Sequence, residues 1–215
     1  MVSNNLTNKG CFIVFEGIDG SGKSTQIKRL AHKLKSLKQD VYQTFEPSDG
    51  PVGTLVRDML KGKVEIDQRT IASLFAADRT DHLVNKRNGI ADKVEKGQTV
   101  LCDRYYFSSY AYHSQYVDMD WVIQSNIINA EILRPDLNIF IDVSPDDCFK
   151  RLEKRQDKFE LYEKIEIIKK VRELYFKAFD KLEKSEHVVI IDGNADEDTV
   201  EKRIFEEVGK KLDLY

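Results

Sequence analysis

The stretch FEGIDGSGKST occupies residues 15–25 and follows the apolar run CFIV at residues 11–14. Its residues 17–24 fit the pattern G-x-x-x-x-G-K-[ST], in which glycines let successive backbone N–H groups converge on one anion. The helix expected after the loop would point its positive N-terminal end at the same anion. The pattern therefore predicts a phosphate-binding loop, or P-loop, at residues 17–25.

The loop combines backbone contacts with two side chains of defined chemistry. Lys23 would place a positive charge on the β- and γ-phosphates, and the Ser24 hydroxyl would ligate Mg²⁺. A chance glycine-rich turn is the alternative, but a strand before the loop and a helix after it match the expected context. The residues predicted to contact the nucleotide are Gly17, Ile18, Asp19, Gly20, Ser21, Gly22, Lys23, Ser24 and Thr25.

Apolar runs separated by helical periodicity continue along the rest of the chain. Strands are predicted at residues 11–16, 41–47, 99–105, 137–143 and 187–192. Helices are predicted at residues 25–39, 67–96 and 120–134, at 145–184 with an interruption at 153–160, and from about residue 196. Apolar strands of this kind predict an α/β fold, with a five-stranded parallel sheet covered by helices on both faces.

Length and composition limit the possible organisation and partners. The chain has 215 residues and shows no repeat or linker, so we expect a single domain over residues 1–215. A net charge of −3 gives no indication of a nucleic-acid partner, and no apolar stretch approaches the ~18 residues of a membrane span. The N-terminal residues lack a signal-peptide core, and three widely spaced cysteines fit reduced thiols in the cytoplasm.

Polar side chains mark further candidate sites. Asp103 and Arg104 end the third predicted strand, at the sheet edge where ligands bind in open α/β folds. The carboxylate could hold Mg²⁺ and the guanidinium could bind a phosphate, although strand-end ion pairs are also common without such a role. Phe75 and Arg79 share one helix face and suit a nucleobase, but a core phenylalanine beside a surface arginine has the same spacing.

The basic stretch RLEKRQDKFE at residues 151–160 lies between two predicted helices. It is interpreted either as a mobile lid that brings Arg155 to a phosphate or as a solvated charged turn. Two function classes then compete: a kinase of a small acceptor and a nucleotide-dependent switch or binding module. A guanine-specific switch requires N-K-x-D, and residues 85–88, NKRN, lack the acid, so the kinase is favoured.

The motifs FEGIDGSGKST, FEP, LFAADR and LCDRY, followed by the short basic lid, resemble those of thymidylate kinases in the same order. The resemblance extends from about residue 12 to residue 192. It implies the P-loop nucleoside monophosphate kinase fold and transfer of a phosphoryl group from ATP to dTMP. Mg²⁺ dependence, formation of dTDP for dTTP synthesis, and a homodimer are further implications.

The resemblance also implies roles for individual residues. Asp19 would contact the sugar 3′-hydroxyl, and Arg57 and Arg104 would bind the dTMP phosphate. Pro47 would lie near the thymine methyl group, Phe75 would stack on thymine, and Arg79 would bond its carbonyl edge. The implied acceptor set is Asp19, Pro47, Arg57, Phe75, Arg79, Arg104, Ser108, Ser109, Tyr112 and His113. The implied metal ligands are Ser24 and Asp103, the implied catalytic residues are Lys23, Arg104 and Arg155, and Arg151 is placed on the adenine side.

Three positions depart from what is usual among relatives. Phe45 stands where bacterial members usually have arginine, and His113 stands where many have glutamine. Gly20 stands where some members have a loop arginine, which makes the lid residue Arg155 the predicted source of catalytic charge. A deoxynucleoside kinase remains the alternative enzyme, with Glu46 at the position of its general base; His32, His82 and His187 receive no role.

Overall fold

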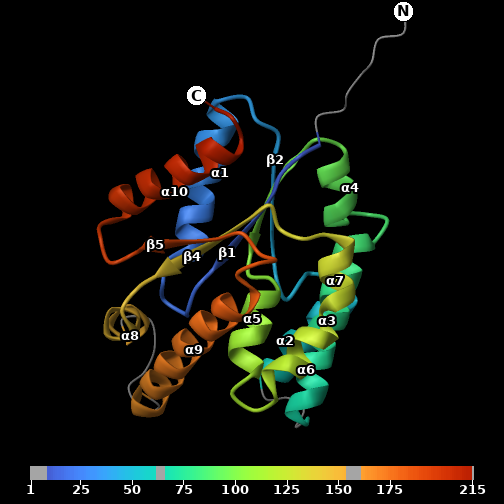
Figure 1. Ribbon diagram of the computed structural model, residues 1–215, viewed down its shortest axis with the longest axis vertical. Helices are drawn as coiled ribbons and strands as arrows, with labels where there is room; N and C mark the ends of the chain where they lie inside the picture. Colours follow the sequence, from blue (N-terminus) through green and yellow to red (C-terminus); the bar gives the residue numbers. More distant parts are fainter. Residues whose placement is uncertain (1–8, 62–65, 154–160, 215) are drawn as a thin grey trace, which may run out of the picture.

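Five parallel strands form one sheet in the computed structural model, which describes residues 9–61, 66–153 and 161–214. The strand order is β2-β3-β1-β4-β5 (Figure 1). The strands are β1 (Phe12–Glu16), β2 (Val41–Phe45), β3 (Thr99–Asp103), β4 (Leu137–Asp142) and β5 (Val188–Asp192). Each lies within two residues of its predicted bounds, so the predicted five-stranded parallel sheet is confirmed.

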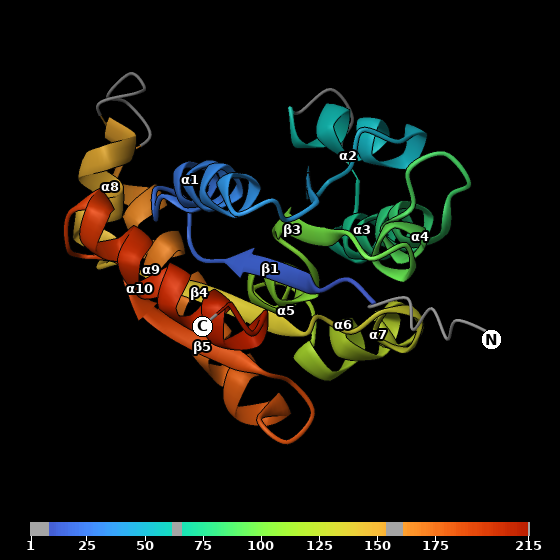
Figure 2. The same ribbon diagram turned by 90° about the horizontal axis from the view of Figure 1, so that it is seen from above.

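Helices cover both faces of the sheet, as predicted (Figures 1 and 2). On one face, α1 (Lys23–Ser36) packs against α10 (Glu197–Lys211); on the other, α5 (Tyr106–His113) packs against α9 (Leu161–Leu182). The other helices are α2 (Pro51–Leu60), α3 (Gln68–Val84), α4 (Ile90–Glu95), α6 (Met119–Ser125), α7 (Ile127–Ile132) and α8 (Pro145–Glu153). Across the described residues, no helix is long and apolar enough to cross a membrane.

The sheet brings two predicted site segments to one edge. Strand β1 lies between β3 and β4, and its Phe15 is paired with Asp103 of β3. Because parallel strands end at the same edge, the loop after β1 and the residues after β3 meet there. Residues 12–15 of β1 are completely buried, so the P-loop extends from the rigid centre of the core.

Two predicted helices are each broken at an asparagine. The helix expected at 67–96 is two helices, because the Oδ1 atom of Asn85 accepts hydrogen bonds from the N–H groups of Arg87 and Asn88 and forms a turn. The helix expected at 120–134 is interrupted at Asn126. Helices α2 and α5 were not predicted, since each spans too few turns to show a clear period.

Candidate active site

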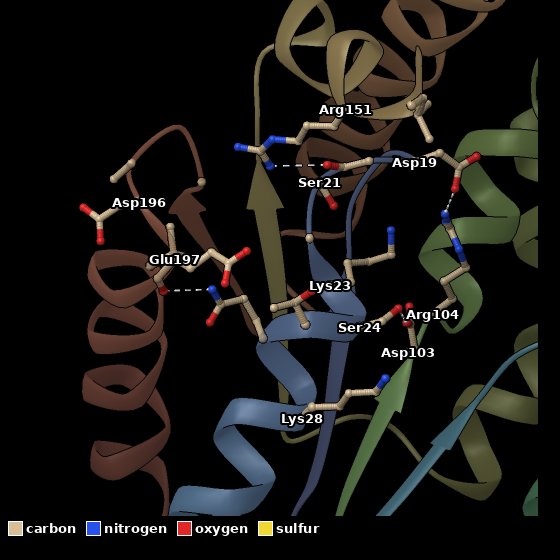
Figure 3. A pocket seen from close by; sticks show the side chains of 18 residues that line it. Asp19, Ser21, Lys23, Ser24, Lys28, Asp103, Arg104, Arg151, Asp196 and Glu197 are labelled. Carbon is tan, nitrogen blue, oxygen red and sulfur yellow. Dashed lines mark hydrogen bonds and ion pairs between the residues drawn. The ribbon is translucent and has the colours of Figure 1, made fainter. Parts of the chain in front are cut away.

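The P-loop turns sharply between β1 and α1. Gly20 and Gly22 have φ angles of 85° and 95°, in the left-handed region that favours glycine. A Cβ atom on Gly20 would lie 2.7 Å from the carbonyl oxygen of Cys148, so the neighbouring helix α8 also excludes a side chain there. The loop can therefore expose its backbone N–H groups toward the cavity shown in Figure 3.

Lys23 is the first residue of α1 and folds back over the loop. Its Nζ atom donates to the carbonyl oxygens of Gly17 and Ile18 at 2.9 and 3.1 Å. Burial, followed by the charge of Arg104, lowers the pKa of Lys23 to about 8. The ammonium is thus held beside the loop, where a bound anion would raise the pKa of Lys23 again and favour its charged form.

Ser24 and Asp103 bring α1 and β3 together. The Ser24 hydroxyl donates to the Oδ2 atom of Asp103 at 2.6 Å (Figure 3). A hydroxyl and a carboxylate oxygen are ligands that Mg²⁺ accepts, usually together with water and substrate phosphates. No cluster of three or more His, Cys, Asp or Glu side chains suited to a metal occurs in the described part of the chain. The predicted Mg²⁺ ligands therefore fit a site that the nucleotide must help to complete.

Arg104 and Asp19 form an ion pair at the centre of the site. The Arg104 Nη2 atom lies 2.5 Å from Asp19 Oδ1, and the same guanidinium donates to Ser108 Oγ at 3.0 Å and to Tyr112 Oη at 3.3 Å. Burial alone would raise the pKa of Asp19, but the charges of Arg104 and Lys23 lower it. Arg104 has a φ angle of 71°, in the left-handed region that residues other than glycine seldom adopt.

One cavity adjoins the P-loop and has a volume of about 850 Å³. Its walls include residues 19–25 of the loop and Arg151 from α8. Gly193, Ala195, Asp196 and Glu197, before and at the start of α10, also line it. The Arg151 Nη1 atom donates to the Gly20 carbonyl oxygen at 3.3 Å (Figure 3). The predicted lid residue Arg155 lies outside the described residues.

A second cavity, of about 490 Å³, lies beside the first. Asp19 and Arg104 line both cavities. Nine of the ten predicted acceptor residues line this second cavity: Asp19, Pro47, Phe75, Arg79, Arg104, Ser108, Ser109, Tyr112 and His113. The sequence did not indicate Leu60, Gln68, Ile71, Gln115, Tyr116 or Ile167, which also line it.

Arg57 is the tenth predicted acceptor residue, and the structure does not bring it into the lining of this cavity. Its Nη1 atom donates to the backbone oxygens of Pro47, at 2.9 Å, and Ser48. Its Nη2 atom lies 3.5 Å from Asp49. In this arrangement Arg57 stabilises the turn between β2 and α2, and its contact with the acceptor phosphate stays a prediction.

The residues predicted to recognise the base line the second cavity together. Phe75 and His113 contact each other edge to face, with ring centroids 4.8 Å apart. Burial, followed by the nearby charge of Arg79, lowers the pKa of His113 to about 4, so this imidazole is neutral at pH 7. Arg79 is itself buried and paired with Glu46, whose Oε2 atom lies 2.8 Å from Arg79 Nε.

Two buried carboxylates that organise the site were not predicted from the sequence. Glu16, at the end of β1, accepts hydrogen bonds from two backbone N–H groups and from the hydroxyls of Ser108 and Tyr175. Asp78, one residue before Arg79, accepts from the N–H and the hydroxyl of Ser48 at 2.7 and 2.6 Å. A charged residue inside an otherwise apolar strand was the available signal for Glu16, since buried charges require partners.

Comparisons with known proteins agree with this geometry. A family model described as thymidylate kinase matches residues 15–204. The chain is 41% identical over 165 residues to a probable thymidylate kinase of Methanocaldococcus jannaschii, covering 76% of this chain and 79% of that protein. It is 37% identical over 196 residues to a putative thymidylate kinase of Treponema pallidum, covering 90% and 92%. It is 38% identical over 204 residues to a probable thymidylate kinase of Methanococcus aeolicus, covering 94% and 95%. The chain therefore belongs to the thymidylate kinase family.

Proposed function

We propose that the protein transfers a phosphoryl group from ATP to dTMP, giving ADP and dTDP for dTTP synthesis. The observation that supports this most directly is the shared Asp19–Arg104 wall between the two cavities. Two substrates bound on either side of that wall would bring donor and acceptor phosphates together. Membership of the thymidylate kinase family supports the identity of the acceptor.

In this reaction the main obstacle is the approach of two anions. A phosphate monoester near pH 7 is mostly dianionic, with a second pKa of about 6, so the acceptor needs no general base. Lys23 and Arg104 supply positive charge on the donor and acceptor sides of the site, and both are preorganised by hydrogen bonds to the protein. Mg²⁺ bound through Ser24 and Asp103 would neutralise phosphate charge, and Arg155 is proposed to add charge in the transition state.

The second cavity has the chemistry to hold a pyrimidine deoxynucleotide. Phe75, Arg79 and Tyr112 line this cavity. Phe75 would supply a ring for stacking, Arg79 would donate to a base carbonyl, and Tyr112 would crowd a ribose 2′-hydroxyl. Asp19 would accept from the sugar 3′-hydroxyl. On the donor side, Arg151 lies against the P-loop and is proposed to contact the nucleotide near its base.

The alternative of a deoxynucleoside kinase is disfavoured by the surroundings of Glu46. A general base must have an oxygen available to the substrate hydroxyl. Both Glu46 oxygens already face protein groups: Oε2 faces two nitrogens of Arg79, and Oε1 faces the imidazole of His82.

The alternative of a switch or binding module is disfavoured because the acceptor cavity adjoins the P-loop, as a second substrate requires.

An ADP-release assay with ATP and one acceptor at a time tests the proposal. We expect turnover with dTMP, and much less with dGMP, because the second cavity is suited to a pyrimidine. Turnover with thymidine alone would favour the deoxynucleoside kinase. An absence of turnover with thymidine, dTMP, dUMP and dGMP would favour the switch.

We also propose a single domain, a homodimer and a cytoplasmic location. The single sheet supports one domain, and three free, buried cysteines fit a reducing compartment.

The homodimer is supported by exposed apolar side chains on α6 and α7. Trp121, Ile127 and Ile128 are 40%, 41% and 62% exposed, and a partner would cover them. Sedimentation should show a dimer that Ile128→Asp dissociates; a monomeric wild-type protein at micromolar concentration would refute the assembly.

A further inference from the structure

Arg79 lines the acceptor cavity, although only 1% of it is exposed. A guanidinium has five N–H donors. The Nε atom donates to Glu46 Oε2 at 2.8 Å, and Nη2 donates to Ser109 Oγ at 3.2 Å and lies 2.7 Å from Glu46 Oε2 in an ion pair. The Nη1 atom donates to Asn126 Oδ1. Within the residues that the structure describes, one N–H of Nη1 is left to meet a ligand.

Asn126 fixes the Nη1 side of this arrangement. It lies at the break between α6 and α7 and is completely buried. Its Nδ2 atom donates to the Val122 carbonyl oxygen at 2.9 Å, and a carbonyl oxygen can only accept. The amide is therefore oriented with Oδ1 toward Arg79. The break between α6 and α7, which the hydrophobic periodicity did not predict, thus places the acceptor Asn126 Oδ1 against the guanidinium of Arg79.

His82 fixes the opposite side through Glu46. It lies on α3, three residues after Arg79, and its Nδ1 atom is 3.3 Å from Glu46 Oε1. Its Nε2 atom is 2.7 Å from the hydroxyl oxygen of Thr44 on β2. Because a carboxylate only accepts, the proton on this imidazole is assigned to Nδ1. Glu46 is thus held between Arg79 and His82, and cannot rotate without breaking one of these contacts.

We infer that Asn126 and His82 are positioning residues that hold Arg79 with a single N–H presented to the acceptor base, and thereby determine selectivity for a base carbonyl over an amino group. Neither residue lines the acceptor cavity. The inference rests on the proposed function, in which Arg79 recognises the carbonyl edge of thymine. It adds the groups that give this recognition its orientation.

The expected selectivity follows from donor and acceptor chemistry. A guanidinium only donates, so it bonds the 4-carbonyl of thymine but opposes the 4-amino group of cytosine. Discrimination requires that the guanidinium stay in place, because a mobile Arg79 could move away and leave the Ser109 hydroxyl to accept from the amino group. Removal of the Asn126 oxygen should therefore relax the discrimination against dCMP as well as weaken dTMP binding.

The test compares Asn126→Ala with Asn138→Ala at saturating ATP. Asn138 is an equally buried asparagine on β4 that bonds the backbone oxygen of His187 at 3.3 Å and lies outside both cavities. In Asn126→Ala the KM for dTMP should rise about tenfold, and the ratio of kcat/KM for dTMP to that for dCMP should fall at least about fivefold. Asn138→Ala should lower Tm without changing this ratio.

A second pair of variants tests whether His82 positions Arg79 through Glu46. This pair also tests the inference if Asn126→Ala does not fold. His82→Leu should raise the KM for dTMP severalfold, and His82→Gln, which can still donate to Glu46, should restore most of the loss. An unchanged KM for ATP is expected in all four variants. An unchanged dTMP-to-dCMP ratio in folded Asn126→Ala, or equal effects of Leu and Gln at His82, would overturn the inference alone. Wild-type protein without dTMP turnover would overturn the proposed function and this inference with it.

Discussion

Replacement of Glu16 by glutamine should reduce catalysis much more than it changes stability. The carboxylate is completely buried, and its Oε1 atom accepts from the backbone N–H groups of Tyr105 and Ser108 at 2.9 and 3.1 Å. Its Oε2 atom accepts from the hydroxyls of Ser108 and Tyr175 at 2.6 and 2.8 Å. Since a carboxylate can only accept, both hydroxyls direct their protons toward Glu16 and keep lone pairs free for Arg104.

The magnitude follows from the bonds that would be lost. In Glu16→Gln, the remaining oxygen can keep the backbone N–H groups, but the new amide donates to the two hydroxyls and competes for their lone pairs. Arg104 Nη1 then loses its bond to Ser108 Oγ at 3.0 Å, whereas its 3.4 Å contact with Tyr175 is too long to count for much. A hydrogen bond to a charged group contributes about 1.5–3 kcal/mol, so kcat/KM for dTMP should fall roughly 10- to 150-fold.

Stability should change little because two effects oppose each other. The substitution loses charge-assisted hydrogen bonds but also removes the cost of a buried charge, so the net change should stay within about 2 kcal/mol. Burial raises the folded-state pKa of Glu16 above its ordinary value of 4.5, despite hydrogen bonds that lower it. Just above pH 4.5 the folded wild type therefore binds more protons than the unfolded chain. Over that window, acidification should stabilise the wild type relative to Glu16→Gln.

Steady-state kinetics and thermal melts of two variants decide the matter. Glu186→Gln is the matched control, because Glu186 is also a buried carboxylate that accepts a tyrosine hydroxyl, from Tyr106 at 2.6 Å, but it lines neither cavity. The Tm of Glu186→Gln should differ from that of the wild type, whereas its kcat/KM should be nearly unchanged. A kcat/KM of Glu16→Gln within a factor of about two of the wild type, or an equal loss in Glu186→Gln, would contradict this role of Glu16.

Three further predictions concern the donor side of the site. Because the pKa of Lys23 is about 8, ATP binding should take up protons above pH 8 and should weaken as the pH rises. Calorimetry in two buffers of different ionisation enthalpy measures this proton uptake, and the absence of any uptake would contradict the assignment of Lys23. Asp103→Asn should raise the Mg²⁺ concentration needed for half-maximal rate at least about tenfold without changing the KM for dTMP, and an unchanged Mg²⁺ titration would exclude Asp103 as a ligand. Arg155→Ala should lower kcat at least about 10²-fold with little change in either KM, whereas kcat within a factor of about two would identify residues 153–160 as a solvated turn.

The local features of the protein could be predicted because neighbouring residues encode them. The P-loop needs a strand, glycines, a lysine and a hydroxyl in immediate succession, and FEGIDGSGKST contains all of them. The strands could be predicted from short apolar runs alone. Their parallel arrangement could be predicted because helices lie between them in the sequence. Asp103 could be placed near Ser24 because the ends of parallel strands meet at one edge, and the two side chains lie 2.6 Å apart.

The orientation of the site residues was decided only by the tertiary structure. Glu16 and Tyr175 are 159 residues apart in sequence, Glu46 and Arg79 are 33 apart, and Arg79 and Asn126 are 47 apart, yet each pair shares a buried hydrogen bond. No period or motif records such partners, because a buried polar group is satisfied by whichever segment the fold brings beside it. The sequence thus predicted which residues would bind two nucleotides, whereas packing of β1, β2, α3, α6 and α9 determined how those residues are held.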